Sequence, residues 1–147
     1  MRKVIQLILG VVCTDLLVGC GSTTQYVPLP DQSKRIEDPS KARIYVVRPT
    51  ALGAAISYSI SDGNRLIGNI GPNGYICWER PEGQMEVIGR AANTSSLPVE
   101  VEQGSVYYIQ QSTYMDYLSV SNRLNLLSEA EGKSKVNRCK PPKVKKK

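Results

Sequence analysis

Short runs of β-branched and aromatic residues, separated by turn residues every eight to twelve positions, fill the chain from residue 41 to residue 111. Residues 42–48 are apolar on both faces of an extended strand and are followed by Pro49, which is typical of a central strand. Residues 56–61 alternate apolar residues with serines, and Asp62-Gly63 then favours a tight hairpin turn. This pattern predicts an all-β domain.

The pattern gives about seven strands, and a chain of 147 residues has room for one such domain with its own core but hardly for two. We therefore expect a small antiparallel β-sandwich over residues 40–127, because two packed sheets bury strands of this kind. The expected strands are residues 42–48, 56–61, 65–70, 75–80, 85–90, 97–102 and 106–111.

Residues 1–19 have the features of a secretory signal peptide. Arg2 and Lys3 are basic, residues 4–12 are nearly all apolar, and the segment is too short to be a stable membrane-spanning helix, which needs roughly 20 apolar residues. Asp15 interrupts the apolar stretch. We expect this leader to be removed.

The end of the leader, Leu17-Val18-Gly19-Cys20, resembles the lipobox of bacterial lipoproteins. In that group the leader is cut between the small residue, here Gly19, and the cysteine, here Cys20, which carries the lipid. Several acyl chains anchor a protein permanently, since each buried methylene contributes about 0.8 kcal/mol. Gly21 and Ser22 follow instead of an aspartate, which by the same resemblance implies the outer membrane, facing the periplasm. The alternative is that Cys20 is an ordinary thiol.

Residues 20–39 are rich in Ser, Thr, Gln, Pro and charged residues, and such a composition cannot bury enough apolar surface to fold alone. We expect this segment to be a lipidated, flexible tether. If Cys20 is acylated, Cys77 and Cys139 remain as a possible disulfide in an oxidising compartment. The alternative is two unpaired thiols.

The last segment, residues 128–147, contains a capping box formed by Ser128 and Glu131, which predicts a short helix from about residue 129 toward residue 138. Pro141 and Pro142 end it, and a disordered, lysine-rich tail follows. The tail lysines are candidates for binding an anionic lipid, lipopolysaccharide or cell-wall surface; the alternative is a solvated tail without a role. These lysines are Lys143, Lys145, Lys146 and Lys147. An exported chain does not meet the chromosome, so we expect no nucleic-acid partner.

The chain contains no histidine, which removes Ser-His and Cys-His nucleophilic pairs and histidine-based metal sites. We expect no catalytic residues, no metal site and no cofactor, and Cys77 is the single candidate nucleophile if the chain is an enzyme after all. The aromatic residues of the later strands either line a ligand surface or pack in the core. They are Trp78, Tyr107, Tyr108, Tyr114 and Tyr117.

Residues 42–49, the hairpin from Asp62-Gly63 to Asn69, Gly74-Tyr75, and residues 102–108 together resemble a group of bacterial lipoprotein domains, the domain-of-unknown-function 2846 type. The resemblance covers about residues 40–112 and implies a small β-sandwich in the cell envelope without catalytic residues to transfer. We therefore expect a non-enzymatic, lipid-anchored binding or structural module that contacts another envelope component. The alternative is an accessory lipoprotein of a secretion, conjugation or exclusion apparatus.

Overall fold

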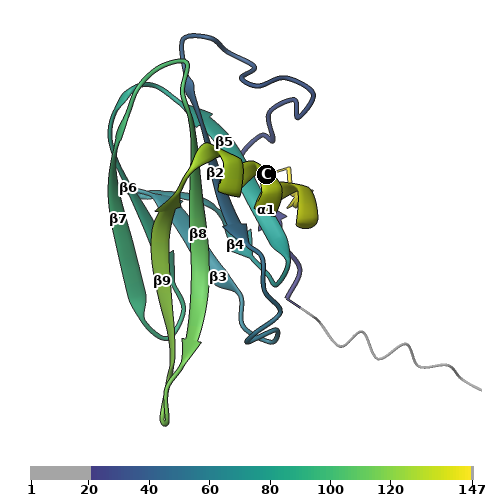
Figure 1. The fold of residues 1–147 in the computed structure, drawn as a ribbon, viewed down its shortest axis with the longest axis vertical. Helices are drawn as coiled ribbons and strands as arrows, with labels where there is room; N and C mark the ends of the chain where they lie inside the picture. The colour runs from purple at the N-terminus through teal and green to yellow at the C-terminus, as the bar shows by residue number, and fades with distance from the viewer. Residues whose placement is uncertain (1–20, 147) are drawn as a thin grey trace, which may run out of the picture.

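The computed structural model describes residues 21–146, and the predicted signal peptide, the predicted cleavage position Gly19 and the predicted lipid-attachment residue Cys20 lie outside the described residues, as does Lys147. The described chain forms two sheets packed face to face, with one short helix on the outside (Figure 1). The predicted β-sandwich is confirmed, with more strands than the seven expected. None of the helices in residues 21–146 has the length and apolar character needed to span a membrane.

The larger sheet has the strand order β10-β1-β4-β3-β6-β7 and the smaller one the order β5-β2-β8-β9. The bounds of the larger sheet are β1 Thr24–Gln25, β3 Tyr58–Asp62, β4 Arg65–Ile70, β6 Gly83–Arg90, β7 Thr94–Val101 and β10 Lys143–Val144. Those of the smaller sheet are β2 Ala42–Arg48, β5 Gly74–Arg80, β8 Val106–Met115 and β9 Val120–Leu127. The helix α1 spans Glu129–Arg138 and follows β9.

The sandwich is not purely antiparallel, contrary to the expectation. β2 pairs in parallel with β8, and β1 pairs in parallel with β10, while the other neighbours are antiparallel. The parallel pairs arise because each joins strands far apart in sequence, so no hairpin turn fixes their direction.

The core between the sheets consists of the apolar residues that face inward on alternate strand positions. Among them are Ala42, Ile44, Val46, Tyr58, Ile60, Ile67, Ile70, Ile76, Trp78, Val87, Val101 and Ile109. A second, smaller cluster lies on the outer face of the smaller sheet, beneath α1, and includes Tyr45, Val47, Tyr75, Cys77 and Tyr108. β2 is therefore buried at every position, as predicted from its apolar residues on both faces of the strand.

The predicted flexible tether is wrong for the described residues 21–39. Residues 23–25 are buried, and Thr24 and Gln25 form β1 in the larger sheet, between β10 and β4. The Gln25 side chain donates to the carbonyl oxygen of Cys77 at 2.7 Å and accepts from its amide at 3.0 Å. These contacts are made by polar side chains and backbone, so a low apolar content did not reveal them.

Gly71 lets the N-terminal segment pack closely against the larger sheet because it has no side chain. Its amide donates to the Thr23 hydroxyl at 3.0 Å, and a Cβ at position 71 would overlap the backbone of Gly21. Only glycine allows these two backbone segments to approach so closely.

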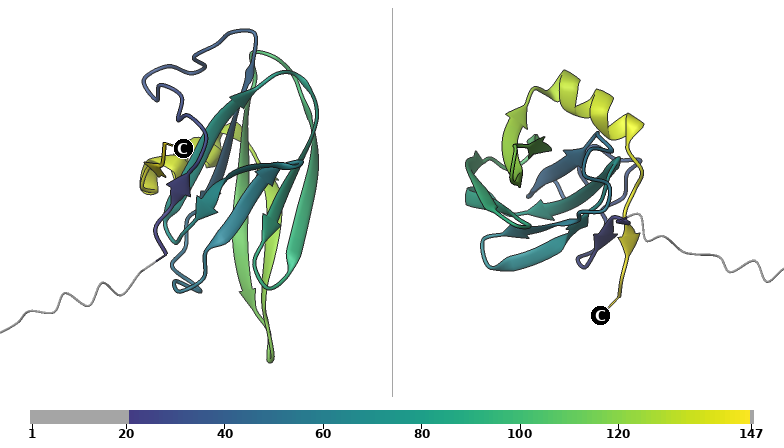
Figure 2. Two further views of the ribbon diagram at one scale, coloured as in Figure 1. Left: turned by 180° about the vertical axis from the view of Figure 1, so that it is seen from behind. Right: turned by 90° about the horizontal axis from the view of Figure 1, so that it is seen from below.

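The predicted C-terminal helix is confirmed, and its capping box forms as expected: Ser128 accepts from the Glu131 amide, and the Glu131 carboxylate accepts from the Ser128 amide. The predicted disordered tail is wrong for its described part, because Lys143 and Val144 pair with Thr24 and Gln25. Figure 2 shows this C-terminal strand beside the N-terminal one at the edge of the sandwich.

Candidate ligand-binding pocket

Three tyrosines form the floor of a pocket of about 430 Å³ on the outer face of the smaller sheet. They come from neighbouring strands, β5, β2 and β8, and register places Tyr45 opposite Tyr108 and Tyr75 opposite Val47. The rings of Tyr45 and Tyr108 stack with centroids 5.1 Å apart and planes at 6°, and the Tyr75 ring lies 5.9 Å from Tyr45 at 57°. The result is a broad aromatic surface.

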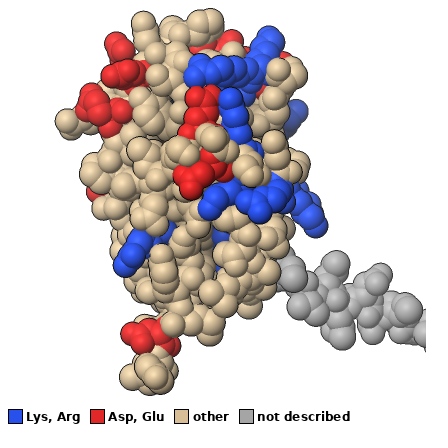
Figure 3. All heavy atoms as spheres, in the orientation of Figure 1, with Lys and Arg blue, Asp and Glu red and all other residues tan. Residues whose placement is uncertain are grey.

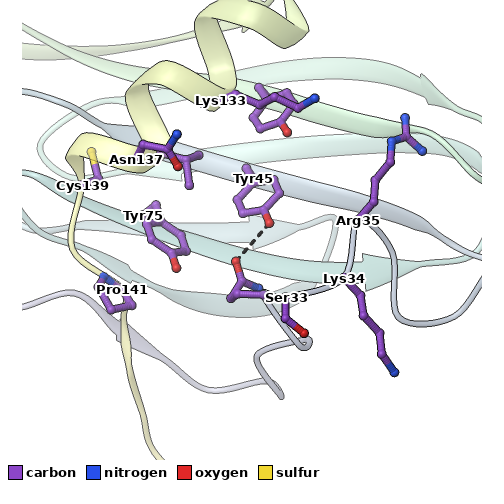
Figure 4. A pocket seen from close by; sticks show the side chains of 12 residues that line it. Ser33, Lys34, Arg35, Tyr45, Tyr75, Lys133, Asn137, Cys139 and Pro141 are labelled. Carbon is purple, nitrogen blue, oxygen red and sulfur yellow. Dashed lines mark hydrogen bonds between the residues drawn. The ribbon is translucent and has the colours of Figure 1, made fainter.

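Two segments form the walls of the pocket around this floor (Figure 4). One is the end of α1 with the residues that follow it, Lys133, Val136, Asn137, Cys139 and Pro141, and the other is the loop 32–35. Figure 4 shows Lys133 on α1 and Arg35 on the loop at one side of the tyrosines, whereas the amino group of Lys34 points away from them.

A buried ion pair holds the loop that carries Arg35. The guanidinium of Arg43 contacts the Glu79 carboxylate at 2.9 Å, and their side chains are 0% and 8% exposed. Arg43 also donates to the carbonyl oxygens of Asp31 and Lys34. Glu79 accepts from the amides of Glu37 and Asp38 at 2.6 and 3.0 Å. The pair thus fixes residues 31–38 against the sheet.

The same contacts set the protonation of Glu79. Burial opposes its ionisation, but the two amide hydrogen bonds and Arg43 outweigh burial and lower the pKa of the Glu79 carboxyl below its usual value. The carboxylate is therefore charged at neutral pH, as the ion pair requires.

The three floor hydroxyl groups differ in their hydrogen bonding. Tyr45 donates to Gln32 Oε1 at 3.0 Å. Within residues 21–146, the hydroxyl groups of Tyr75 and Tyr108 make no hydrogen bond with protein, although both side chains are largely buried. Burial raises the pKa of both phenols, so they remain protonated and able to donate. Two donors therefore face the pocket without a partner in the described chain.

The rim carries an excess of positive charge. Lys133 pairs with Glu129 at 2.8 Å, and Lys34 lies 4.0 Å from Asp31, in both cases on exposed side chains. Arg35 donates to the carbonyl oxygen of Gly104 at 2.7 Å and makes no ion pair within the described residues. Figure 3 shows basic and acidic side chains together over this upper part of the molecule.

Cys77 and Cys139 are free thiols, so the structure does not contain the possible disulfide. Cys77 is buried in β5, whereas Cys139 is half-buried directly after α1, where it lines the wall of the pocket.

Cys77 is also a poor nucleophile in this environment. Its burial raises the pKa of the thiol to about 12, partly offset by a hydrogen bond from Gln32 Nε2 at 3.7 Å. The reactive species is the thiolate, which is scarce at neutral pH with such a pKa.

The remaining predicted site residues are scattered. Trp78 is in the core, Tyr107 packs on the inner face, and Tyr114 and Tyr117 lie in the β8–β9 hairpin, so only Tyr108 of the five aromatic candidates lines the pocket. Of the tail lysines, Lys143, Lys145 and Lys146 are exposed beside β1. Because β10 runs parallel to β1, Lys145 and Lys146 lie farther from Gly21 than Lys143 does.

The sequence did not single out Tyr45, Tyr75, Arg35 or Lys133 as one site. Tyr45 and Tyr75 lie on alternate strand positions that face outward, but only the strand order β5-β2-β8 brings them beside Tyr108. No cluster of three or more Cys, Asp or Glu residues suited to hold a metal occurs in residues 21–146.

No protein-family model matches this chain, and no curated protein is significantly similar to it. The resemblance to the 2846-type domains therefore stays a prediction.

Proposed function

We propose that this chain is a non-enzymatic binding module of the bacterial cell envelope, anchored by lipid at Cys20 in the outer membrane and facing the periplasm. The leader and the Leu17-Val18-Gly19-Cys20 sequence support the anchor. The observation that carries the binding function is the pocket, with its tyrosine floor, two unpartnered hydroxyl groups and basic rim.

The chemistry of the pocket fits a small anionic envelope component. Arg35 and Lys133 attract a carboxylate or phosphate, and the hydroxyl groups of Tyr75 and Tyr108 donate to its oxygens. Flat or apolar parts of the ligand stack on the rings. Acidic cell-wall peptides and the phosphate groups of lipopolysaccharide have this combination of features.

The anchor is tested by labelling cells with radioactive palmitate and recovering the protein. We expect label in the natural chain, which fractionates with outer membranes, and none in Cys20→Ser, whose leader stays uncut. Unlabelled natural protein in the cytosol would overturn the anchor.

The pocket is tested by NMR titration with soluble cell-wall stem peptides and, separately, with phosphorylated lipopolysaccharide core oligosaccharide. We expect shifts at Tyr75, Tyr108 and α1, and a weakening of about tenfold in Arg35→Gln or Lys133→Gln, since a hydrogen bond to a charged group contributes about 1.5–3 kcal/mol. Lys145→Gln, a basic residue outside the pocket, is the matched control. Equal binding by all three variants, or shifts confined to other surfaces, would refute the assignment of the pocket.

A further inference from the structure

The end of the sandwich that holds Gly21 carries a projecting hairpin whose tip exposes large apolar side chains. β8 pairs with β2 only as far as Gln110, and residues 111–115 continue past it with β9, about 17 Å at 3.3 to 3.4 Å per residue. The hairpin is seen at the bottom of Figure 1. At its tip Met115, Tyr117 and Leu118 are 65%, 101% and 99% exposed.

A second apolar loop fills the space between this hairpin and Gly21. Residues 49–57 connect β2 to β3 and contain no charged residue. A Cβ at Gly53 would touch Thr113 of the hairpin, and one at Gly21 would touch Ser57 and Ala54. Gly21, the loop 49–57 and the hairpin are therefore continuous at this end.

The connections at the two ends of the sandwich differ sharply in charge. Gly21 lies at the end with residues 49–57, 71–73, 91–93 and 116–119, and Asp116 is the single charged residue among them. The connections at the opposite end, residues 29–41, 63–64, 81–82 and 102–105, carry eight charged residues. They are Asp31, Lys34, Arg35, Glu37, Asp38, Lys41, Glu82 and Glu102. Figure 3 agrees, since most blue and red side chains lie in its upper half.

The charged groups near the uncharged end suit a headgroup region. Arg123 lies over the ring of Tyr114 at 5.0 Å, and Lys140 and Lys143 flank Gly21 and Ser22. Asp116 accepts from the amide of Tyr117 at 2.7 Å and thereby shapes the turn. Its carboxylate limits how deep the tip can enter an apolar phase.

We propose that this end of the sandwich rests on the phospholipid surface and that the hairpin tip, Tyr117 and Leu118, inserts into the interface between headgroups and acyl chains. The proposal rests on the lipid anchor proposed above. Cys20 directly precedes Gly21 in the sequence, and one residue of chain spans at most about 3.6 Å. Because residues 23–25 are buried in the sheet, only Gly21 and Ser22 lie between the proposed lipid-bearing residue and the buried part of the domain.

The lipid surface explains the composition of the tip. Tyrosine is enriched at membrane interfaces, and exposed leucine beside it adds apolar area that lipid can cover. A tilt of the domain brings Gly21 and the tip to the bilayer together. The anchor thus fixes which end faces the membrane, and the pocket, on the side of the smaller sheet, stays open to solvent.

A tryptophan reporter tests the proposal. The lipidated full-length mature protein, carrying Tyr117→Trp, is reconstituted in vesicles of phosphatidylethanolamine and phosphatidylglycerol with brominated acyl chains. We expect a blue shift and quenching of its fluorescence. Leu66→Trp is the matched control, an exposed position near the opposite end, and Trp78, 1% exposed, is a common background in both.

The outcomes separate the two proposals. Adding Leu118→Asp to the reporter should reduce the quenching, because a carboxylate resists entry into lipid. If the protein floats with the vesicles but Tyr117→Trp is quenched no more than Leu66→Trp, the orientation is refuted while the anchor stands. If the protein carries no lipid and does not float, the anchor is refuted, and the orientation with it.

Discussion

Arg48 is a fully buried cation whose partners are backbone carbonyls. It donates to the carbonyl oxygens of Leu52 and Gly53 at 3.0 and 2.8 Å and to that of Ile56, and its guanidinium lies 4.9 Å from the centre of the Tyr58 ring. Burial lowers the pKa of this guanidinium, although it stays charged. One side chain therefore organises the loop 49–57.

We predict that Arg48→Met lowers the free energy of unfolding by about 3 kcal/mol, because it leaves three partly buried carbonyl oxygens without a donor, each at a cost of up to about 1–3 kcal/mol, and the removed charge returns part of the loss. Urea unfolding followed by fluorescence of Trp78 measures it. Arg90→Met, at an exposed arginine, is the control and should change little. Equal midpoints for the two variants would contradict this role of Arg48.

Glu79 makes stability depend on pH. Its folded pKa lies below the unfolded value of 4.5, so the unfolded chain takes up the proton first as the pH falls. The stabilisation is complete above pH 4.5 and is lost as the pH falls through the folded pKa.

We predict that Glu79→Gln is less stable than the natural chain at pH 7 by about 3 kcal/mol, because it leaves Arg43 buried without its anion. It should also lose less stability than the natural chain between pH 5 and pH 3. Urea midpoints across this range measure both effects, with Glu100→Gln, an exposed carboxylate, as control. A parallel pH dependence in natural chain and variant would rule out this linkage.

The helix α1 packs against the smaller sheet through Gly132. This residue is buried against Tyr108, and a Cβ there would overlap the tyrosine ring. Helix propensity alone predicts that Gly132→Ala stabilises the helix by about 1 kcal/mol. The contact with Tyr108 makes the expected effect of Gly132→Ala destabilising instead.

We predict that Gly132→Ala destabilises the protein by about 1–3 kcal/mol, the usual cost of overpacking, and displaces the ring at the floor of the pocket. Ser134→Ala, on an exposed position of the same helix, should be neutral or slightly stabilising. Thermal unfolding compares the two. A stabilised Gly132→Ala would show that α1 does not press on Tyr108.

Local signals explain which elements the sequence predicted. The doubly apolar β2, the hairpin at Asp62-Gly63 and the capping box of α1 each involve neighbouring residues, and each forms as expected. β9 was missed because only Asn122 and Leu124 of its eight residues are buried, so it lacks a clear apolar alternation.

The pocket could not be predicted in the same way. Tyr45, Tyr75 and Tyr108 are separated from one another by at least thirty residues. Two of them are brought together by the parallel pairing of β2 with β8, and because no hairpin turn joins these strands, no turn sequence predicts their pairing. The loop that carries Arg35 is held by Glu79, which is 36 residues from Arg43 and 42 residues from Glu37.

The two ends of the described chain pair with each other at one edge of the larger sheet. β1 lies between β10 and β4, and the amides of Lys143 and Lys145 donate to the carbonyl oxygens of Thr23 and Gln25 at 3.0 and 2.9 Å. β10 pairs with no other strand, so its order depends on β1 being in place.

We predict that Gln25→Leu releases both ends together, because the lost amide leaves the Cys77 backbone and two further carbonyl oxygens, of Val27 and Pro28, without a partner. Hydrogen exchange should lose protection at Tyr26, Lys143 and Lys145 at once, while β2 stays protected. Gln84→Leu, at an exposed glutamine, controls for the substitution itself. Protection that persists at Lys143 after its loss at Tyr26 would show that β10 is held independently of β1, and the predicted coupling of the two ends would be wrong.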